Sequence, residues 1–462
     1  MSRGFVHPNG RPIWGTLLLA LLLLACAGCR FEPEGKAAGS LPVRVTVEVA
    51  IFEGGYGIEW HNKVAREYER LHPGIKVNLW GDPRVDEKLK PRVLRGDPPD
   101  VANSLLPVWK LITAGKLYAL DEALDSPAYD ISGQTWRQTL LPGVLSSYRY
   151  QGKTYAMPTD FGAWVVWYDR RLFRKHGWQP PHTWDEFRAL CEKIKAAGIA
   201  PVAFQGKYPI YLWSTLLSLY MRLVPPETWY ALQDLKPGAF REPGFIKAAA
   251  MAQELAVKYH QPGAGAMTHT ESQLEWVNGR AALVFCGLWL PNEMKEATPK
   301  EFEIDCFPVP AVEAGTRLRV WGDPNAVYGG GGAQFFVFAG ARHPREGADF
   351  LKFMVSRERA KTYTAALGAL SPVRGGTEGV PLTPALQSAV KLVAKADRIY
   401  SDRLTSLYLE FGSKDAPAHL AALMQNEITP EEFANRMEAS IENVRRNPDI
   451  YKPPAMGVPR SE

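Results

Sequence analysis

Aromatic side chains gather at positions where the hydrophobic periodicity of the chain does not require them. They lie at the ends of expected strands or in loops, and they are Tyr56, Phe161, Trp164, Tyr208, Tyr211, Trp213 and Trp289. Flat aromatic faces combined with side-chain acceptors and amides suit a sugar, because a sugar ring has an apolar C–H face and a rim of hydroxyl groups. Any one of these rings could instead pack in a core. Their clustering is what favours a binding site.

Motifs for covalent chemistry are weak in this sequence. Residues 152–154 imitate the end of a phosphate-binding loop, but the first glycine of that motif would fall at Ser147. The glycine run at 329–332 precedes an expected strand instead of joining a strand to a helix, so it is no dinucleotide fingerprint. Glu53 and Asp160 could form a glycosidase pair, although their separation along the chain does not give their distance in space. We therefore expect no catalytic residue and keep a secreted glycan hydrolase as the alternative.

The cysteines and histidines do not have the spacing of a metal site, and we expect neither a metal nor a cofactor. His260 and His269 are expected at the surface or in hydrogen bonds. Cys191 falls on the apolar face of an expected helix, which predicts a buried free thiol. Cys286 and Cys306 each lie in a strand-like run, so a disulfide between neighbouring strands is possible.

Length and charge bound the class of protein. The chain has 462 residues, more than one hydrophobic core usually organises, so we expect at least two domains. The formal net charge of +5 is spread along the chain without a basic block. We therefore do not expect nucleic acid as a partner.

The N-terminal residues have the pattern of an export signal. Arg3 and Arg11 precede an uncharged apolar run over residues 13–25. The run is shorter than the about 20 apolar residues that a helix needs to cross a bilayer. We therefore expect an exported protein.

Small residues followed by cysteine close this run and resemble the lipobox of bacterial lipoproteins. The resemblance implies a signal peptide over residues 1–29 and a lipid on Cys29, with Cys26 as the alternative. An ordinary secretory signal with incidental cysteines is the other interpretation. Residues 30–41, with Pro, Gly, Ser and Glu, are expected to form a tether.

Strands and helices alternate in the first part of the chain. Strands are expected over 43–52 and 75–80 and from residue 100, with helices ending near 70 and covering 85–95. This order predicts a mainly parallel sheet covered by helices. Ligands bind beyond the carboxyl ends of the strands in such sheets. The residues expected there are Glu53, Tyr56, Asp82, Asn103 and Ser104.

The first of these helices has apolar residues at spacings of four, four and three, namely Trp60, Val64, Tyr68 and Leu71. Such spacing predicts that the four side chains share one buried face.

Residues 148–177 are expected to carry the chain from one α/β unit to the next. The β-branched and aromatic run at 163–168 predicts a strand. Beyond it, Thr183 and Glu186 form a capping box that starts a helix. A strand over 199–204 and an aromatic loop over 208–213 should follow, and later a strand over 281–285 and a loop that holds Trp289.

Longer motifs resemble the extracellular solute-binding proteins of bacterial ABC transporters, the large family that includes the maltose-binding protein. They include GDPPDVAN at 96–103, YQGKTYAMPTDFGAWVVWYDRRLF at 150–173 and NGRAALVFCGLWL at 278–290. Within the family, GKYPIYL at 206–212 and LKPGAF at 235–240 resemble binders of N-acetylglucosamine and diacetylchitobiose.

This resemblance implies an α/β fold of two lobes joined by a multi-stranded hinge, with a cleft between the lobes. Lobe 1 would take residues 42–155 and 311–370, lobe 2 would take 156–310 and 371–450, and a C-terminal tail would cover 451–462. By position, Gly330 and, more weakly, Arg374 join the ligand-binding residues, whereas Pro324 departs from the maltose-type loop. The chain up to about Pro158 would be the first hinge strand, and residues 159–164 would line the cleft, with Asp160 accepting from a sugar hydroxyl.

The function implied is that of a substrate-binding lipoprotein of a carbohydrate importer. It would capture an amino sugar or short oligosaccharide by hinge closure and deliver it to the membrane permease. Another oligosaccharide is the open alternative for the ligand. We expect a monomer that is anchored by its lipid to the cell membrane, in the periplasm or on the outer face of the cytoplasmic membrane.

Overall fold

The computed structural model describes residues 44–455, apart from 105, 142–143, 146–147, 313–325, 333 and 397. The expected signal peptide, its Cys29 or Cys26, the tether, Pro324 and most of the C-terminal tail lie outside the described residues. In the described part, no helix has both the length and the apolar character that a bilayer span requires.

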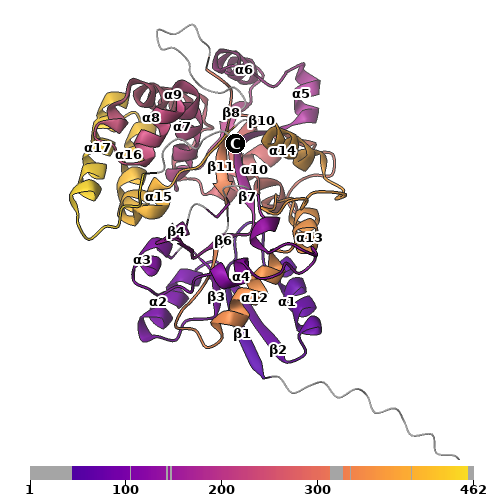
Figure 1. Cartoon of the computed structure of the whole chain (residues 1–462). Helices are drawn as coiled ribbons and strands as arrows, with labels where there is room; N and C mark the ends of the chain where they lie inside the picture. The colour runs from indigo at the N-terminus through magenta and orange to yellow at the C-terminus, as the bar shows by residue number, and fades with distance from the viewer. Residues whose placement is uncertain are drawn as a thin grey trace, which may run out of the picture. The chain divides into compact units, whose positions relative to one another are not determined.

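The first sheet has the strand order β2-β1-β3-β12-β6 (Figure 1). Its strands are β1 (Val45–Phe52), β2 (Ile75–Asp82), β3 (Val101–Asn103), β6 (Met157–Pro158) and β12 (Gln334–Val337). β1 pairs in parallel with both β2 and β3, which confirms the parallel arrangement predicted from the alternating strands and helices. β12 runs antiparallel to β3 and β6. We call this sheet and its helices the first lobe.

Helix α1 (Glu59–Leu71) packs by the predicted face, with one exception. Trp60, Val64 and Tyr68 are buried, but Leu71 is 61% exposed. Leu71 is the last residue of the helix, and the chain turns away there toward β2. His61 is buried on the same helix instead.

The second sheet has the order β13-β11-β7-β9-β8, and β10 also pairs with β7. Its strands are β7 (Phe161–Asp169), β8 (Ala200–Ala203), β9 (Ala281–Gly287), β10 (Ile304–Pro308), β11 (Val327–Gly331) and β13 (Ile399–Tyr400). β7 lies at the centre, because β9 follows one of its edges while β11 and β10 share the other. We call this sheet and its helices the second lobe.

Helices pack around both sheets (Figure 1). The first lobe includes α2 (Val85–Arg95), α3 (Val108–Thr113), α4 (Asp121–Leu124), α12 (Pro344–Met354) and α13 (Arg357–Leu367). The second includes α5 (Arg170–His176), α6 (Trp184–Ala196), α7 (Ile210–Leu223), α8 (Pro226–Gln233), α9 (Pro243–Tyr259), α10 (His269–Val277), α11 (Leu290–Glu293), α14 (Pro384–Ala394), α15 (Leu404–Leu407), α16 (Ala416–Met424) and α17 (Pro430–Arg446). The hairpin β4 (Arg149–Tyr150) and β5 (Lys153–Thr154) precedes β6.

The sequence signals of helix α6 are confirmed. The Thr183 hydroxyl accepts from the Glu186 amide at 3.2 Å, and the Glu186 carboxylate accepts from the Thr183 amide at 3.4 Å. Cys191, on the inner face of the helix, is a buried free thiol.

The disulfide that the sequence left possible between Cys286 and Cys306 is not formed, because both residues are free thiols. Cys286 lies opposite Val165 on one edge of β7, and Cys306 lies opposite Trp167 on the other edge. The two cysteines are thus two strand spacings apart, about 10 Å. A disulfide does not span more than about 7 Å between Cα atoms.

Two of the segments that carry the chain between the sheets lie side by side. β6 ends at Pro158 in the first sheet and β7 begins at Phe161 in the second, as predicted for the first hinge strand. The return runs antiparallel beside it, since β11 ends opposite Phe161 and β12 begins opposite Pro158. Between them, the Gly332 amide donates to the Asp160 carbonyl at 3.0 Å. The two crossings therefore form one hydrogen-bonded ladder.

The boundaries predicted for the returning segments need correction. Lobe 1 was expected to resume at residue 311, but β11 pairs with β7, so the first sheet resumes only at β12. Lobe 2 was expected to resume at 371, yet Val373 packs in the core of the first lobe, and only α14 returns to β10.

Candidate functional site

The carboxyl ends of β1, β2 and β3 meet at one edge of the first sheet. Phe52, at the end of β1, lies opposite Asp82, and Ile51 lies opposite Asn103. The parallel register thus brings the predicted residues of three loops to the same edge. We call Glu53 to Gly57, Asp82 and Asn103 with Ser104 the first-lobe loops.

Polar side chains of the first-lobe loops are held by their own lobe. Asp82 accepts from the Arg84 amide at 2.6 Å and from the Lys88 ammonium. Asn103 donates from Nδ2 to the Gln334 carbonyl at 2.9 Å, and the Ser104 hydroxyl accepts from the Leu106 amide at 3.2 Å. Asn103 and Ser104 are both buried.

Tyr56 is the aromatic side chain of these loops. It is half-buried, and its ring lies 6.0 Å from the ring of Tyr363 in an edge-to-face arrangement. Burial, and then the nearby carboxylate of Asp160, raise the pKa of Tyr56 well above its ordinary value. Its hydroxyl therefore stays protonated and available as a donor.

Three aromatic rings cluster at the start of β7 in the second lobe. The ring of Trp164 lies 5.8 Å from that of Tyr211 in the first turn of α7 and 6.1 Å from that of Trp289. Trp164 Nε1 donates to Thr215 Oγ1 at 3.1 Å, which fixes the ring against α7. A Cβ at Gly287 would lie 2.0 Å from the Trp289 ring, so this ring position requires glycine there. We call Trp164, Tyr211 and Trp289 the aromatic cluster.

The expected aromatic loop at 208–213 is mostly helix, because α7 begins at Ile210. Trp213 is therefore a core residue: it is 2% exposed, packs near Phe240 and Phe245, and donates from Nε1 to Asp402 at 3.1 Å. Tyr208 stays outside the helix and is 42% exposed.

The first-lobe loops touch the second lobe at helix α11. Asn292 Nδ2 donates to the Gly55 carbonyl at 2.5 Å. A Cβ at Gly55 would lie 3.5 Å from both the Trp289 ring and Glu293 Cβ. The contact places Tyr56 and its loop beside the aromatic cluster.

Asp160 lies on the crossing between β6 and β7 and is 4% exposed. A Cβ at Gly332 would lie 2.1 Å from an Asp160 carboxylate oxygen, and one at Gly329 would lie 2.0 Å from the Gly162 carbonyl. The glycine run thus lets the returning strand approach Asp160 closely. Gly330 lies in this run opposite Gly162, and Phe161 donates its amide to the Leu370 carbonyl at 2.6 Å.

Two other predicted residues lie differently. Arg374 is exposed, and its backbone contacts are with the Thr139 carbonyl and the Arg357 guanidinium rather than with the aromatic cluster. His260 is partly exposed, and its ring stacks on that of Phe204 with the ring centres 4.2 Å apart. Burial lowers the pKa of His260 to about 3, and His260 Nε2 has no hydrogen-bond partner among the described residues.

Sequence reasoning missed a polar group on α10 and α11. His269 Nε2 lies 3.3 Å from Glu293 Oε1, and Gln273 Nε2 donates to Glu293 Oε2 at 2.8 Å. The ring of Tyr208 lies 5.8 Å from that of His269. No spacing rule singles out these residues, because only the fold brings the two helices together.

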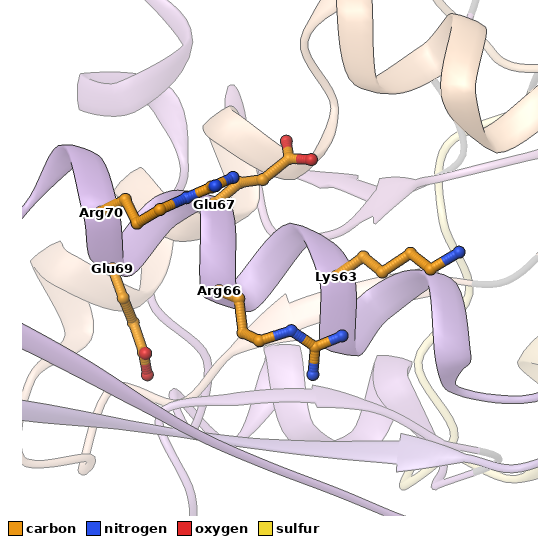
Figure 2. A pocket seen from close by; sticks show the side chains of 5 residues that line it. All are labelled: Lys63, Arg66, Glu67, Glu69 and Arg70. Carbon is orange, nitrogen blue, oxygen red and sulfur yellow. The ribbon is translucent and has the colours of Figure 1, made fainter.

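Two surface hollows lie away from the aromatic cluster. Figure 2 shows one of about 510 Å³, lined by side chains that leave α1 in different directions: Lys63, Arg66, Glu67, Glu69 and Arg70. The other, of about 260 Å³, lies at the Asp169 end of β7, opposite the end that carries Trp164. Within the described ranges, no group of three or more His, Cys, Asp or Glu side chains is arranged to hold a metal ion.

Known proteins are similar in sequence to this chain over most of its length. The family model described as bacterial extracellular solute-binding protein matches residues 55–361. The diacetylchitobiose binding protein NgcE of Streptomyces coelicolor is 26% identical over 385 residues, covering 82% of this chain and 79% of that protein. The multiple sugar-binding protein of Streptococcus mutans is 26% identical over 378 residues, covering 79% and 83%.

Solved structures share the fold. RafE of Streptococcus pneumoniae in complex with raffinose superposes with a TM-score of 0.69 at 22% identity, covering 87% of this chain and 99% of RafE. A chitin oligosaccharide binding protein superposes with a TM-score of 0.69 at 20% identity, covering 84% and 95%. These likenesses confirm the predicted two-lobe α/β fold. With the match over residues 55–361, they establish that the chain belongs to the bacterial extracellular solute-binding protein family.

Proposed function

We propose that the protein is the sugar-binding component of a bacterial ABC importer, with an amino sugar or a short oligosaccharide of the N-acetylglucosamine or chitobiose type as its ligand. The relatives support a sugar, since one is named for diacetylchitobiose and another for multiple sugars. By this proposal the lipid on Cys29, or on Cys26, holds the protein at the membrane, and the partner is the importer's permease.

The aromatic cluster is the observation that carries this proposal. The centre of the Trp164 ring lies 6.1 Å from that of Trp289 and 5.8 Å from that of Tyr211. Trp289 and Tyr211 are only partly buried. Rings of this kind pack against the C–H face of a sugar. Asp160 and the protonated hydroxyl of Tyr56 supply an acceptor and a donor for sugar hydroxyls.

Binding would proceed by closure of the lobes. The ladder between the two crossings, with its run of glycines, is where the backbone bends when the lobes move. The sugar would first contact the aromatic cluster, and the first-lobe loops would then close over it. In the closed form, the hydrogen bond from Asn292 Nδ2 to the Gly55 carbonyl would join the two lobes. A ligand that contacts both lobes favours closure because it binds the closed form more tightly.

A calorimetric titration of the purified protein tests the proposal. The ligands are N-acetylglucosamine, diacetylchitobiose, cellobiose, maltose and xylobiose, each with and without a chelator. We expect saturable binding of at least one of these sugars that the chelator does not change. Recovery of the intact sugar afterwards separates binding from hydrolysis. No saturable binding by any of the five sugars would overturn the proposal.

A further inference from the structure

Two buried glutamine side chains beside the aromatic cluster each keep one polar atom without a partner. Gln205 follows β8 by two residues and is 4% exposed, and Gln273 lies on α10 and is 1% exposed. Gln205 Nε2 and Gln273 Oε1 have no hydrogen-bond partner among the residues that the structure describes. Leaving such atoms unpaired in a protein interior is unfavourable, so each calls for an explanation.

The orientation of both amides is fixed by their other atoms. Gln205 Oε1 accepts from the Tyr208 amide at 3.2 Å, and Gln273 Nε2 donates to Glu293 Oε2 at 2.8 Å. A backbone N–H only donates and a carboxylate only accepts, so turning either amide around would break its bond. The unpaired atoms are therefore a donor on Gln205 and an acceptor on Gln273.

Both glutamines belong to the polar group that adjoins the aromatic cluster. Glu293, which holds Gln273, has its other oxygen 3.3 Å from His269, whose ring lies 5.8 Å from Tyr208. A Cβ at Gly55 would lie 3.6 Å from the carboxyl carbon of Glu293. Glu293 thus holds the Gln273 amide through one oxygen and has His269 beside the other, which makes it a positioning residue for Gln273.

We infer that Gln205 and Gln273 recognise the acetamido group of an N-acetylated sugar; this rests on the proposed sugar-binding function. The acetamido carbonyl accepts from Gln205 Nε2, and the acetamido N–H donates to Gln273 Oε1. The exposed ring of Tyr208, next to Gln205, contacts the acetyl methyl group. A hydroxyl also donates and accepts, but it does so from one oxygen, whereas the N–H and C=O of the acetamido group are on separate atoms and point in opposite directions. A hydroxyl at the same ring position therefore does not span the two glutamine atoms as the acetamido group does, and it has no methyl group for Tyr208.

A pair of matched ligands tests this inference. Diacetylchitobiose and cellobiose have the same rings and linkage and differ in having acetamido groups or hydroxyls at the second carbon. We expect the wild-type protein to bind diacetylchitobiose more tightly than cellobiose by about tenfold or more, because the hydroxyl of cellobiose does not span the two glutamine atoms and offers no methyl group to Tyr208. Calorimetry gives both dissociation constants.

Two variants locate the preference. Gln205→Glu keeps the acceptor for the Tyr208 amide and removes the donor, and Gln273→Met keeps the size of the side chain and removes the acceptor. Each should lower the ratio of the two affinities by about fivefold or more. Gln233→Glu is the control, since Gln233 also accepts from a backbone amide, that of Arg403, and also has an unpaired Nε2, but lies on α8. It should leave the ratio unchanged, and melting curves identify any variant that is misfolded.

The outcomes separate the inference from the proposed function. If cellobiose binds as tightly as diacetylchitobiose, or if both glutamine variants keep the wild-type ratio, the inference is overturned while sugar binding stands. If no sugar binds to the wild-type protein, the proposed function fails and the inference fails with it.

Discussion

The two sides of the candidate site differ in which side-chain groups remain available to contact a ligand. On the first-lobe loops, Asp82 is held by Arg84 and Lys88, and Asn103 is held by the Gln334 carbonyl. On the second lobe, the partly exposed rings of Tyr211 and Trp289 form one cluster with Trp164, and two buried glutamines keep an unpaired atom each. We therefore propose that the second lobe binds the ligand first and that the first lobe closes over it.

The elements explain this difference. In the loops at the carboxyl ends of the parallel strands, backbone groups and polar side chains pair with each other, as at Asp82 and Asn103. The aromatic cluster is instead held by a central strand and the starts of two helices, which fix large rings at small conformational cost. Rings held in this way provide most of the binding energy at many interfaces.

The largest effect is expected from Trp289→Ala in the aromatic cluster. Removing this ring takes away a packing surface for the sugar and the contact with Gly55, so affinity should fall by about 30- to 100-fold in calorimetry. Trp80→Ala is the control, because Trp80 lies in the first sheet and donates from Nε1 to Glu48 at 3.0 Å. If both variants lose affinity equally, the loss does not come from the aromatic cluster.

Asp160→Ala tests the crossing between the lobes. The variant loses a buried acceptor for a sugar hydroxyl, so affinity should fall by about tenfold while the protein stays folded. Asp160→Asn, which keeps an acceptor oxygen, should lose less affinity for the sugar than Asp160→Ala. Unchanged affinity in the alanine variant would remove Asp160 from the site.

Asn292→Ala tests the closing contact. It removes the hydrogen bond to the Gly55 carbonyl, so the ligand should dissociate about threefold faster in stopped-flow measurements while its association rate stays the same. A slower association with unchanged dissociation would show that Asn292 acts in the first encounter instead.

The smallest effect is expected from Asp82→Ala. Because the carboxylate of Asp82 is held by Lys88 and the Arg84 amide, affinity should change by less than about twofold. A loss as large as that of Trp289→Ala would contradict the difference between the two sides of the site.

Much of the fold follows from local patterns in the sequence. The periodicity predicts α2 at its observed bounds and β1 to within two residues of its start, and the alternation of elements predicts the parallel register of the first sheet. The strand order of the second sheet does not follow from local patterns, since β7 lies between two strands that occur more than 100 residues later. For that reason the sequence left open whether Cys286 and Cys306 pair, and the strand order shows that they do not.

The site is predictable only in part for the same reason. Tyr56, Trp164, Tyr211 and Trp289 are large rings that the sequence places beside turns or at strand ends. The fold brings the last three together and places Tyr56 near Asp160. Trp213 was expected in a loop but lies in α7. The run from 210 to 223 is apolar on nearly all sides, so periodicity does not show where this helix begins.

The glutamines and Asn292 have no sequence signal at all. Each is a single polar residue, and its importance comes from a tertiary contact or from the lack of one.

Titration of the full chain with diacetylchitobiose, followed by calorimetry and tryptophan emission, tests the central claim most directly. We expect saturable binding to one site with a change in tryptophan emission, a loss of affinity of about 30- to 100-fold in Trp289→Ala and almost none in Asp82→Ala. The proposed site would be contradicted if neither diacetylchitobiose nor any other sugar in the panel showed saturable binding. It would also be contradicted if Asp82→Ala lost more affinity than Trp289→Ala.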